Sequence, residues 1–327
     1  MARKLLLPVA ALLLWHATAM SQTVVSGPSE GDIVFKLYAE HGPDSQVELI
    51  NGVPADKNAW QTVVNALLTK PGVVPKVTCT GVFIGPGVFL TAAHCFDAGP
   101  GRALRDGVWV NVGNQNLQAS CQISDEYVAA VKAQVWKFVK PRVSADYALC
   151  SFTLTSETPT SLVNLPSENV DVSTPLASNV QILLTGYGCT SPKILKSPDA
   201  ADVDLGGLLR IGDVTITTMP ASGVADANNF VVVRSPLKSA PALCPGDSGG
   251  PVMTGATEIK QDVKRRVRGL NSSVQLDDDG GGNFAISRVV PLDTPTFQRF
   301  SQTWLDQHQG RTICGLHGTE GFLPCRE

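Results

Sequence analysis

The chain is poor in several kinds of residue, and the shortages exclude broad classes of protein. Only 6% of its 327 residues are aromatic and 17% are charged, and the formal net charge is −3 at pH 7. Nucleic-acid-binding domains carry a basic patch or stripe, which this charge balance does not favour. The apolar run from Leu5 to Trp15 is shorter than the roughly 20 residues that span a bilayer. We therefore expect no nucleic-acid partner and no membrane residence.

Histidine is also scarce, which narrows the choice of a general base. Of the five histidines, His16 and His41 lie near the N-terminus, and His308 and His317 lie near the C-terminus. His94 alone follows an apolar, strand-like run, in the sequence Thr-Ala-Ala-His-Cys. A histidine held at the end of a buried strand is well placed for general-base chemistry.

The N-terminus has the features of an export signal. Arg3 and Lys4 precede the apolar run, and an Ala-x-Ala cleavage site ends at Ala19. We therefore predict a signal peptide over residues 1–19 and a secreted protein, either extracellular or periplasmic. Eight cysteines fit such an oxidising compartment. They lack paired C-x-x-C units, so disulfides are favoured over a zinc site, and about 105 pairings are open.

Glycine is concentrated around one serine. Residues 244–251 read Cys-Pro-Gly-Asp-Ser-Gly-Gly-Pro, so glycines flank Ser248 and let the backbone approach a bound molecule. A serine hydroxyl is a weak nucleophile and needs a base, while the oxyanion that it creates needs fixed donors. Asp146 is an isolated acid in an apolar segment, where a charge needs a partner. It is a candidate to fix the tautomer of His94.

The segments TAAHC, ADYALC and CPGDSGGP, in that order, resemble the signatures of the trypsin/chymotrypsin family of serine endopeptidases. The resemblance covers roughly residues 49–309, and the order His, Asp, Ser separates it from subtilisins and α/β-hydrolases. It implies a catalytic triad of His94, Asp146 and Ser248. It further implies an oxyanion hole formed by the N–H groups of Gly246 and Ser248, protein or peptide substrates, and no metal or other cofactor.

The resemblance also implies how the cysteines pair. The family's histidine-loop bridge corresponds to the cysteines on either side of the strands before His94, and each bridge contributes roughly 2–4 kcal/mol. The implied disulfides are Cys79 with Cys95, Cys121 with Cys150, Cys189 with Cys244, and Cys314 with Cys325.

The Leu-Ile-Asn-Gly segment that begins at Leu49 resembles the N-terminus of activated family members. This implies that residues 20–48 form a propeptide of a zymogen, and that the freed ammonium group of Leu49 pairs with Asp247. The residue before the cut is Glu48, where trypsin-like activation needs Arg or Lys. A Glu-directed activating protease, an autocatalytic cut and a start at Ile50 all stay open.

Short strand-like runs separated by Gly, Pro, Asn and Asp predict an all-β protein. The resemblance implies two six-stranded antiparallel Greek-key β-barrels, over residues 49–165 and 166–309, joined by a crossover within residues 160–173. A tail over residues 310–327 follows. The expected strands are Val77–Ile84, Val108–Val112, Val180–Thr185, Val214–Thr218, Phe230–Arg234, Pro251–Thr254, Val267–Val274 and Phe284–Val290.

One helix is expected at the end of the second barrel. Thr294 can cap its N-terminus, Pro295 suits the first turn, and Gly310 ends it. Its apolar stripe, which we expect to pack against the second barrel, consists of Phe297, Phe300 and Trp304.

Ala242 lies six residues before Ser248, at the position that forms the base of the family's substrate pocket. An Asp at that position selects Arg and Lys, but a pocket without a carboxylate cannot offset the desolvation of a cation. Alignment of the following strand places Ser272 beside Asp146 and Val274 at the pocket wall. We therefore expect a small or medium apolar side chain before the scissile bond.

The opposite wall of the pocket falls at Phe284 or Ala285. The expected function is that of a monomeric, secreted serine endopeptidase whose partners are its substrates and an activating protease. The alternative is a secreted binding or toxin-like homologue that uses the fold as a scaffold, although such proteins usually lose a triad residue.

Overall fold

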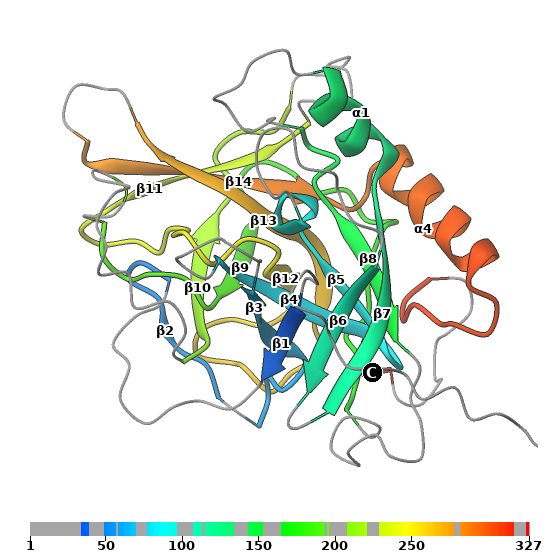
Figure 1. The fold of residues 1–327 in the computed structure, drawn as a ribbon. Helices are drawn as coiled ribbons and strands as arrows, with labels where there is room; N and C mark the ends of the chain where they lie inside the picture. Colours follow the sequence, from blue (N-terminus) through cyan, green and yellow to red (C-terminus); the bar gives the residue numbers. More distant parts are fainter. Residues whose placement is uncertain are drawn as a thin grey trace, which may run out of the picture.

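The computed structural model gives two β-structures and a helix near the C-terminus (Figure 1). Residues 1–19, Glu48 and half of the predicted tail lie outside the described residues. Among the described residues, no helix has both the length and the apolar character needed to cross a bilayer. The structure describes residues 34–38, 49–56, 58–69, 77–96, 107–112, 115–133, 143–152, 165–192, 195, 208–220, 229–277, 282–316 and 325–326.

The N-terminal half forms a closed barrel with the strand order β1-β3-β4-β5-β8-β7-β6. All neighbours are antiparallel except β1 and β6, which are parallel. Every residue of β5 and β8 is buried, which places these two strands in the core. The strands are β1 (Val34–Tyr38), β3 (Val63–Thr69), β4 (Val77–Gly85), β5 (Val88–Thr91), β6 (Gly107–Val112), β7 (Gln115–Ile123) and β8 (Ala148–Phe152).

The C-terminal half forms an antiparallel sheet with the order β11-β14-β13-β12-β9-β10-β2. A bridge between Thr218, just after β10, and Val232 of β11 brings the next-to-last strand of this order against the first, so the sheet curls back on itself. The strands are β2 (Val53–Pro54), β9 (Gln181–Gly186), β10 (Arg210–Thr215), β11 (Val231–Pro236), β12 (Pro251–Thr254), β13 (Arg266–Leu276) and β14 (Phe284–Pro291).

This architecture confirms the predicted all-β fold with two barrels. Each barrel has one strand beyond the six expected, and both extra strands come from the N-terminal part of the chain. β1 lies within residues 20–48, the predicted propeptide, and β2 pairs with β10 directly after Leu49. Each predicted strand overlaps an observed one. The largest shift is in β10, which begins at Arg210 because it pairs with β9 along its whole length.

The helix α1 (Asp125–Ala133) was not predicted. Its N-terminus is capped by Ser124, whose Oγ accepts the N–H of Tyr127 at 3.1 Å. The same hydroxyl donates to the carbonyl of Ala145 at 2.6 Å. The cap therefore ties α1 to the segment that leads to Asp146.

The C-terminal helix α4 (Pro295–Gln307) begins as predicted, with Thr294 Oγ1 accepting the N–H of Phe297 at 3.2 Å. The rings of Phe297 and Phe300 each lie 5.0 Å from the ring of Tyr147. Because Tyr147 belongs to the N-terminal half, α4 also packs against the first barrel, which the sequence analysis did not expect. The helix supports the residue next to Asp146.

Four disulfides form in the structure, and they are the pairs that the family resemblance implies. The disulfides are Cys79–Cys95, Cys121–Cys150, Cys189–Cys244 and Cys314–Cys325.

The crossover between the barrels is described from residue 165 onward. There the N–H of Glu168 donates to Phe83 O of the first barrel at 2.9 Å, and Val170 bridges to Val267 of the second.

Candidate active site

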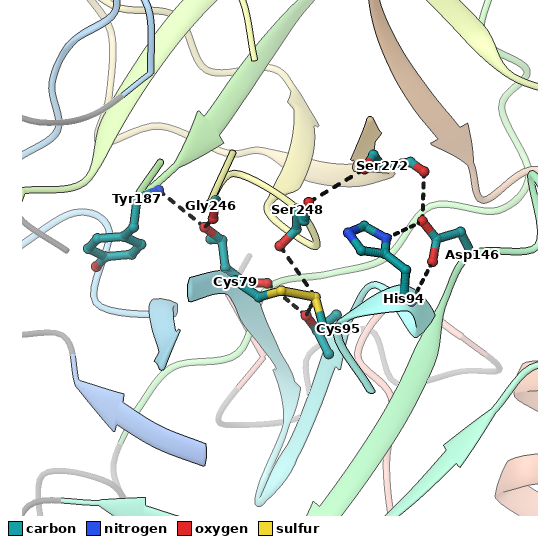
Figure 2. Close-up of a disulfide and its surroundings, with 10 residues drawn as sticks. Cys79, His94, Cys95, Asp146, Tyr187, Gly246, Ser248 and Ser272 are labelled. Carbon is teal, nitrogen blue, oxygen red and sulfur yellow. Dashed lines mark hydrogen bonds and ion pairs between the residues drawn. A yellow bond between two sulfur atoms is a disulfide. The ribbon is translucent and has the colours of Figure 1, made fainter. Parts of the chain in front are cut away.

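Strand pairing in the first barrel brings His94 and Asp146 together. His94 lies in a short 3-10 helix (Ala93–Phe96) after β5, and Asp146 lies just before β8, the neighbour of β5. The Nδ1 atom of His94 is 2.7 Å from Asp146 Oδ2, and the backbone N–H of His94 donates to Oδ1 at 2.8 Å. The carboxylate therefore holds both the ring and the backbone of His94 (Figure 2).

The electrostatics of this pair fix the histidine tautomer. Burial disfavours the charged form of Asp146, but the charge interaction with His94 and the hydrogen bonds from His94 and Ser272 outweigh it and hold its pKa below the ordinary value. Asp146 is therefore ionised at neutral pH and can only accept hydrogen bonds. The proton of a neutral His94 must then lie on Nδ1, which leaves Nε2 as the free base.

Ser272, on β13 of the second barrel, completes the surroundings of the carboxylate. Its Oγ donates to Asp146 Oδ2 at 2.6 Å. Asp146 and Ser272 are only 3% and 7% exposed, so this bond between the barrels is shielded from water. The bond locks the orientation of the carboxylate that holds His94.

Ser248 lies on the other side of the imidazole. Figure 2 shows the His94 ring between Asp146 and Ser248. In this structure the Ser248 hydroxyl donates to the carbonyl of Ser272, at 3.5 Å, and not to His94. Catalytic hydrogen bonds are often long or misaligned before substrate binds.

The loop that carries Ser248 needs its glycines. Gly246 and Gly249 have φ values of +105° and +81°, in the region that only glycine adopts without strain. A Cβ on Gly249 would also lie 2.2 Å from Thr91 Oγ1. The loop therefore rests directly on the strands of the first barrel.

Two backbone N–H groups in this loop have no acceptor within the described part of the chain, those of Gly246 and Ser248. Their neighbours are engaged: Asp247 donates to Cys244 O at 3.0 Å, and Gly249 donates to Asn271 O at 2.7 Å. Buried N–H groups without a partner are rare in native proteins. Two unpaired N–H groups at one turn, on the buried Gly246 and the partly buried Ser248, can receive a developing oxyanion.

Thr80, on β4, holds this turn in place and was missed by the sequence analysis. Its Oγ1 donates to Gly246 O at 3.0 Å and accepts the N–H of Tyr187 at 3.1 Å, while its own N–H donates to Ser248 O at 2.8 Å. The only sequence signal is that it follows Cys79 directly. A threonine after a cysteine does not by itself reveal contacts with residues more than a hundred positions away.

Asp247 is fully buried next to Ser248. Its two carboxylate oxygens accept the N–H groups of Gly188 and Cys244, each at 2.7 Å. Burial nevertheless outweighs these bonds and raises the pKa of Asp247 to about 8. A Cβ on Gly186 would lie 2.0 Å from Oδ1, so the carboxylate fills its site completely. Among the described residues, no cationic side chain pairs with it.

The predicted start of the mature chain pairs with the segment that leads to this carboxylate. Leu49 and Ile50 are fully buried. Ile50 forms an antiparallel bridge with Ala242, with the N–H of each donating to the carbonyl of the other at 3.1 and 3.0 Å. Ala242 is five residues before Asp247.

Ala242 is fully buried within a group of apolar side chains. Val274 packs against this group. Of the two candidates for the opposite wall, Ala285 belongs to the group, whereas the ring of Phe284 lies 3.5 Å below the guanidinium of Arg234. The buried members are Ile50, Cys189, Leu237, Ala242, Cys244 and Ala285.

No set of three or more metal-ligating side chains gathers anywhere in the described ranges.

Comparisons with known proteins fit this geometry. A family model described as Trypsin matches residues 49–290, which is well over half of the chain. No curated protein matches the chain. Among solved structures, the chain is similar to one titled "Structure of Glu endopeptidase in complex with MPD", at 13% identity and a TM-score of 0.47. That match covers 80% of this chain and 100% of the other.

Proposed function

Because this chain belongs to the trypsin family and is a serine endopeptidase, we propose that Ser248, His94 and Asp146 are its catalytic triad. The observation that carries the proposal is the continuous contact from Ser272 through Asp146 to His94, beside Ser248. These roles are those of the trypsin-family triad.

In the first step, His94 Nε2 takes the proton of Ser248 as Oγ bonds to the carbonyl carbon of the substrate. The carbonyl oxygen becomes an anion and accepts hydrogen bonds from the N–H groups of Gly246 and Ser248. His94 then gives the proton to the leaving amine as the C–N bond breaks, which leaves an acyl group on Ser248. Water, activated by His94 in the same way, releases the acid. Asp146 stabilises the imidazolium in both halves.

We further propose that the protein is exported through the signal peptide 1–19 as a zymogen and cut before Leu49. The ammonium group freed at Leu49 would pair with Asp247, a buried carboxylate that is costly without a partner. A start at Leu49 is favoured over one at Ile50 because the N–H of Ile50 already donates to Ala242. The four disulfides support an oxidising destination.

This pairing predicts how pH affects the uncut chain. The pKa of Asp247 is about 8 there, above its ordinary value of 3.8, so the folded state holds the proton more tightly than the unfolded state. The resulting stabilisation is complete below pH 3.8 and is lost as the pH rises through about 8. A paired ammonium would lower this pKa and prevent the loss.

The test compares cut and uncut Ser248→Ala protein by melting temperature from pH 5 to pH 9. At pH 8 we expect the melting temperature of the uncut form to lie several degrees below that of the cut form. A loss of about 1 kcal/mol in the free energy of unfolding lowers the melting temperature of a chain of this size by about 2–4 °C. The Asp247→Asn variant, which cannot ionise, should remove the pH dependence of the gap. If the cut and uncut Ser248→Ala forms that keep Asp247 showed the same dependence of melting temperature on pH, this would contradict the pairing.

We also propose that the substrate residue before the scissile bond has a small or medium apolar side chain, because the group around Ala242 and Val274 is apolar. A peptide library cut by the processed protein should show Ala, Val or Leu preferred over Arg and Lys by about 10²-fold or more, since an unpaired cation is costly in such a site.

The Ala242→Asp variant is the matched control for this profile, and it should raise cleavage after Arg and Lys relative to Leu at least about tenfold. A wild-type preference for Arg, Lys or Glu would reject the pocket assignment. If the processed protein cut no peptide in the library, the binding-protein alternative would replace the peptidase proposal.

A further inference from the structure

Strand β1 occupies an unusual place for a segment that the proposed cut would release. In Figure 1 it lies between β3 and β6, and it pairs with both. The pairing with β3 is antiparallel and runs from Val34 opposite Thr69 to Tyr38 opposite Asn65. The pairing with β6 is parallel. In the described part of the barrel, β3 and β6 have no direct pairing, and β1 alone joins them.

The backbone of an inner strand is hydrogen-bonded on both sides. If β1 left, β3 and β6 would each present a row of unpaired N–H and C=O groups, which favours aggregation. Opposite Leu37 on β3 stands Ala66, a fully buried residue, so β1 runs alongside the core and not over an exposed rim. Closure of the barrel is what removes these edges.

No disulfide holds this segment. The first cysteine of the chain is Cys79, and all eight cysteines pair with one another. After a cut before Leu49, only non-covalent contacts would keep residues 20–48 with the rest of the protein.

We propose that the β3 and β6 edges form a binding surface for the strand Val34–Tyr38, and that the segment carrying it stays bound there as a separate peptide after the cut. The active enzyme is then a non-covalent two-chain protein whose first barrel is completed by its own propeptide. This proposal rests on the proposed cut before Leu49, but not on the catalytic roles.

Retention is tested on the full chain carrying Ser248→Ala and an enteropeptidase recognition sequence inserted directly before Leu49. Because the cut is made by an added protease, the result is independent of any peptidase activity of the chain. After the cut, we expect the N-terminal peptide to co-elute with the large fragment in native gel filtration and to separate in guanidinium without reductant. A peptide that elutes separately while the large fragment keeps its melting temperature would overturn the proposal.

Two substitutions at one position separate backbone pairing from side-chain effects. Lys36→Pro removes an N–H from an inner strand, whereas Lys36→Thr keeps it and suits a strand. In the cut protein, Lys36→Pro should raise the dissociation constant of the peptide at least about tenfold, while Lys36→Thr should retain it as the parent does. Equal retention by both variants would reject the pairing.

Hydrogen exchange decides the matter if Lys36→Pro does not fold. In the cut parent protein, the amides of residues 34–38 should exchange as slowly as those of β3, because both strands belong to one closed barrel. Exchange at the rate of an unfolded peptide would overturn the proposal.

Discussion

Replacement of Ser248 by alanine is expected to lower kcat for peptide hydrolysis by about 10⁶-fold, the size of effect seen when a triad nucleophile is removed. The reason is that, in the proposed mechanism, the acyl intermediate forms on Oγ of Ser248, which the variant lacks. An organophosphorus reagent that modifies Ser248 in the wild type should no longer label the variant. Activity and labelling are measured on the same processed preparations.

Two controls make this result specific. The Ser248 hydroxyl makes one 3.5 Å hydrogen bond, to Ser272 O, so its removal should leave the melting temperature close to that of the wild type. Ser239→Ala changes an exposed serine in the same half of the chain and should keep full activity. Full peptidase activity in Ser248→Ala would show that the nucleophile is another residue.

The parts of the site that could be predicted are those carried by short, local patterns. His94, Asp146 and Ser248 each stand in a segment whose neighbours mark it, and the cap residue Thr294 and the stripe of α4 follow from helix geometry alone. The Ser124 cap of α1 was readable by the same rule, since Asp125 and Glu126 follow it in the first turn.

The rest depends on contacts between distant segments. Thr80 matters because β4 passes beneath the Ser248 loop, and no property of the residue reveals that. The strand β1 is five residues long and lies before the expected start of the mature chain, so no sequence pattern predicted its place in a barrel. Similarly, the hydrogen bond from Ser248 to Ser272 reflects a side-chain rotation that residue identity does not determine.

Asp146→Asn is expected to lower kcat by about 10⁴-fold, the loss found for the corresponding change in another enzyme of the family. The structure gives a specific reason. The backbone N–H of His94 donates to Oδ1 at 2.8 Å, so the oxygen of an asparagine must occupy that side. Its NH₂ group then faces Nδ1, which lies 2.7 Å from Oδ2 in the wild type.

A donor facing Nδ1 turns that nitrogen into an acceptor and moves the ring proton to Nε2, which can then no longer take the proton of Ser248. The variant should therefore lose kcat more than KM, and its reaction with an organophosphorus reagent should slow in parallel. Asp171→Asn is the matched control. Like Asp146, Asp171 is a carboxylate with a lowered pKa, here about 2. Its hydrogen bonds come from the N–H groups of Ser173 and Thr174 and not from His94. Wild-type kcat in Asp146→Asn would mean that Asp146 does not set the tautomer, whereas loss of activity in both variants would point to general damage to the fold.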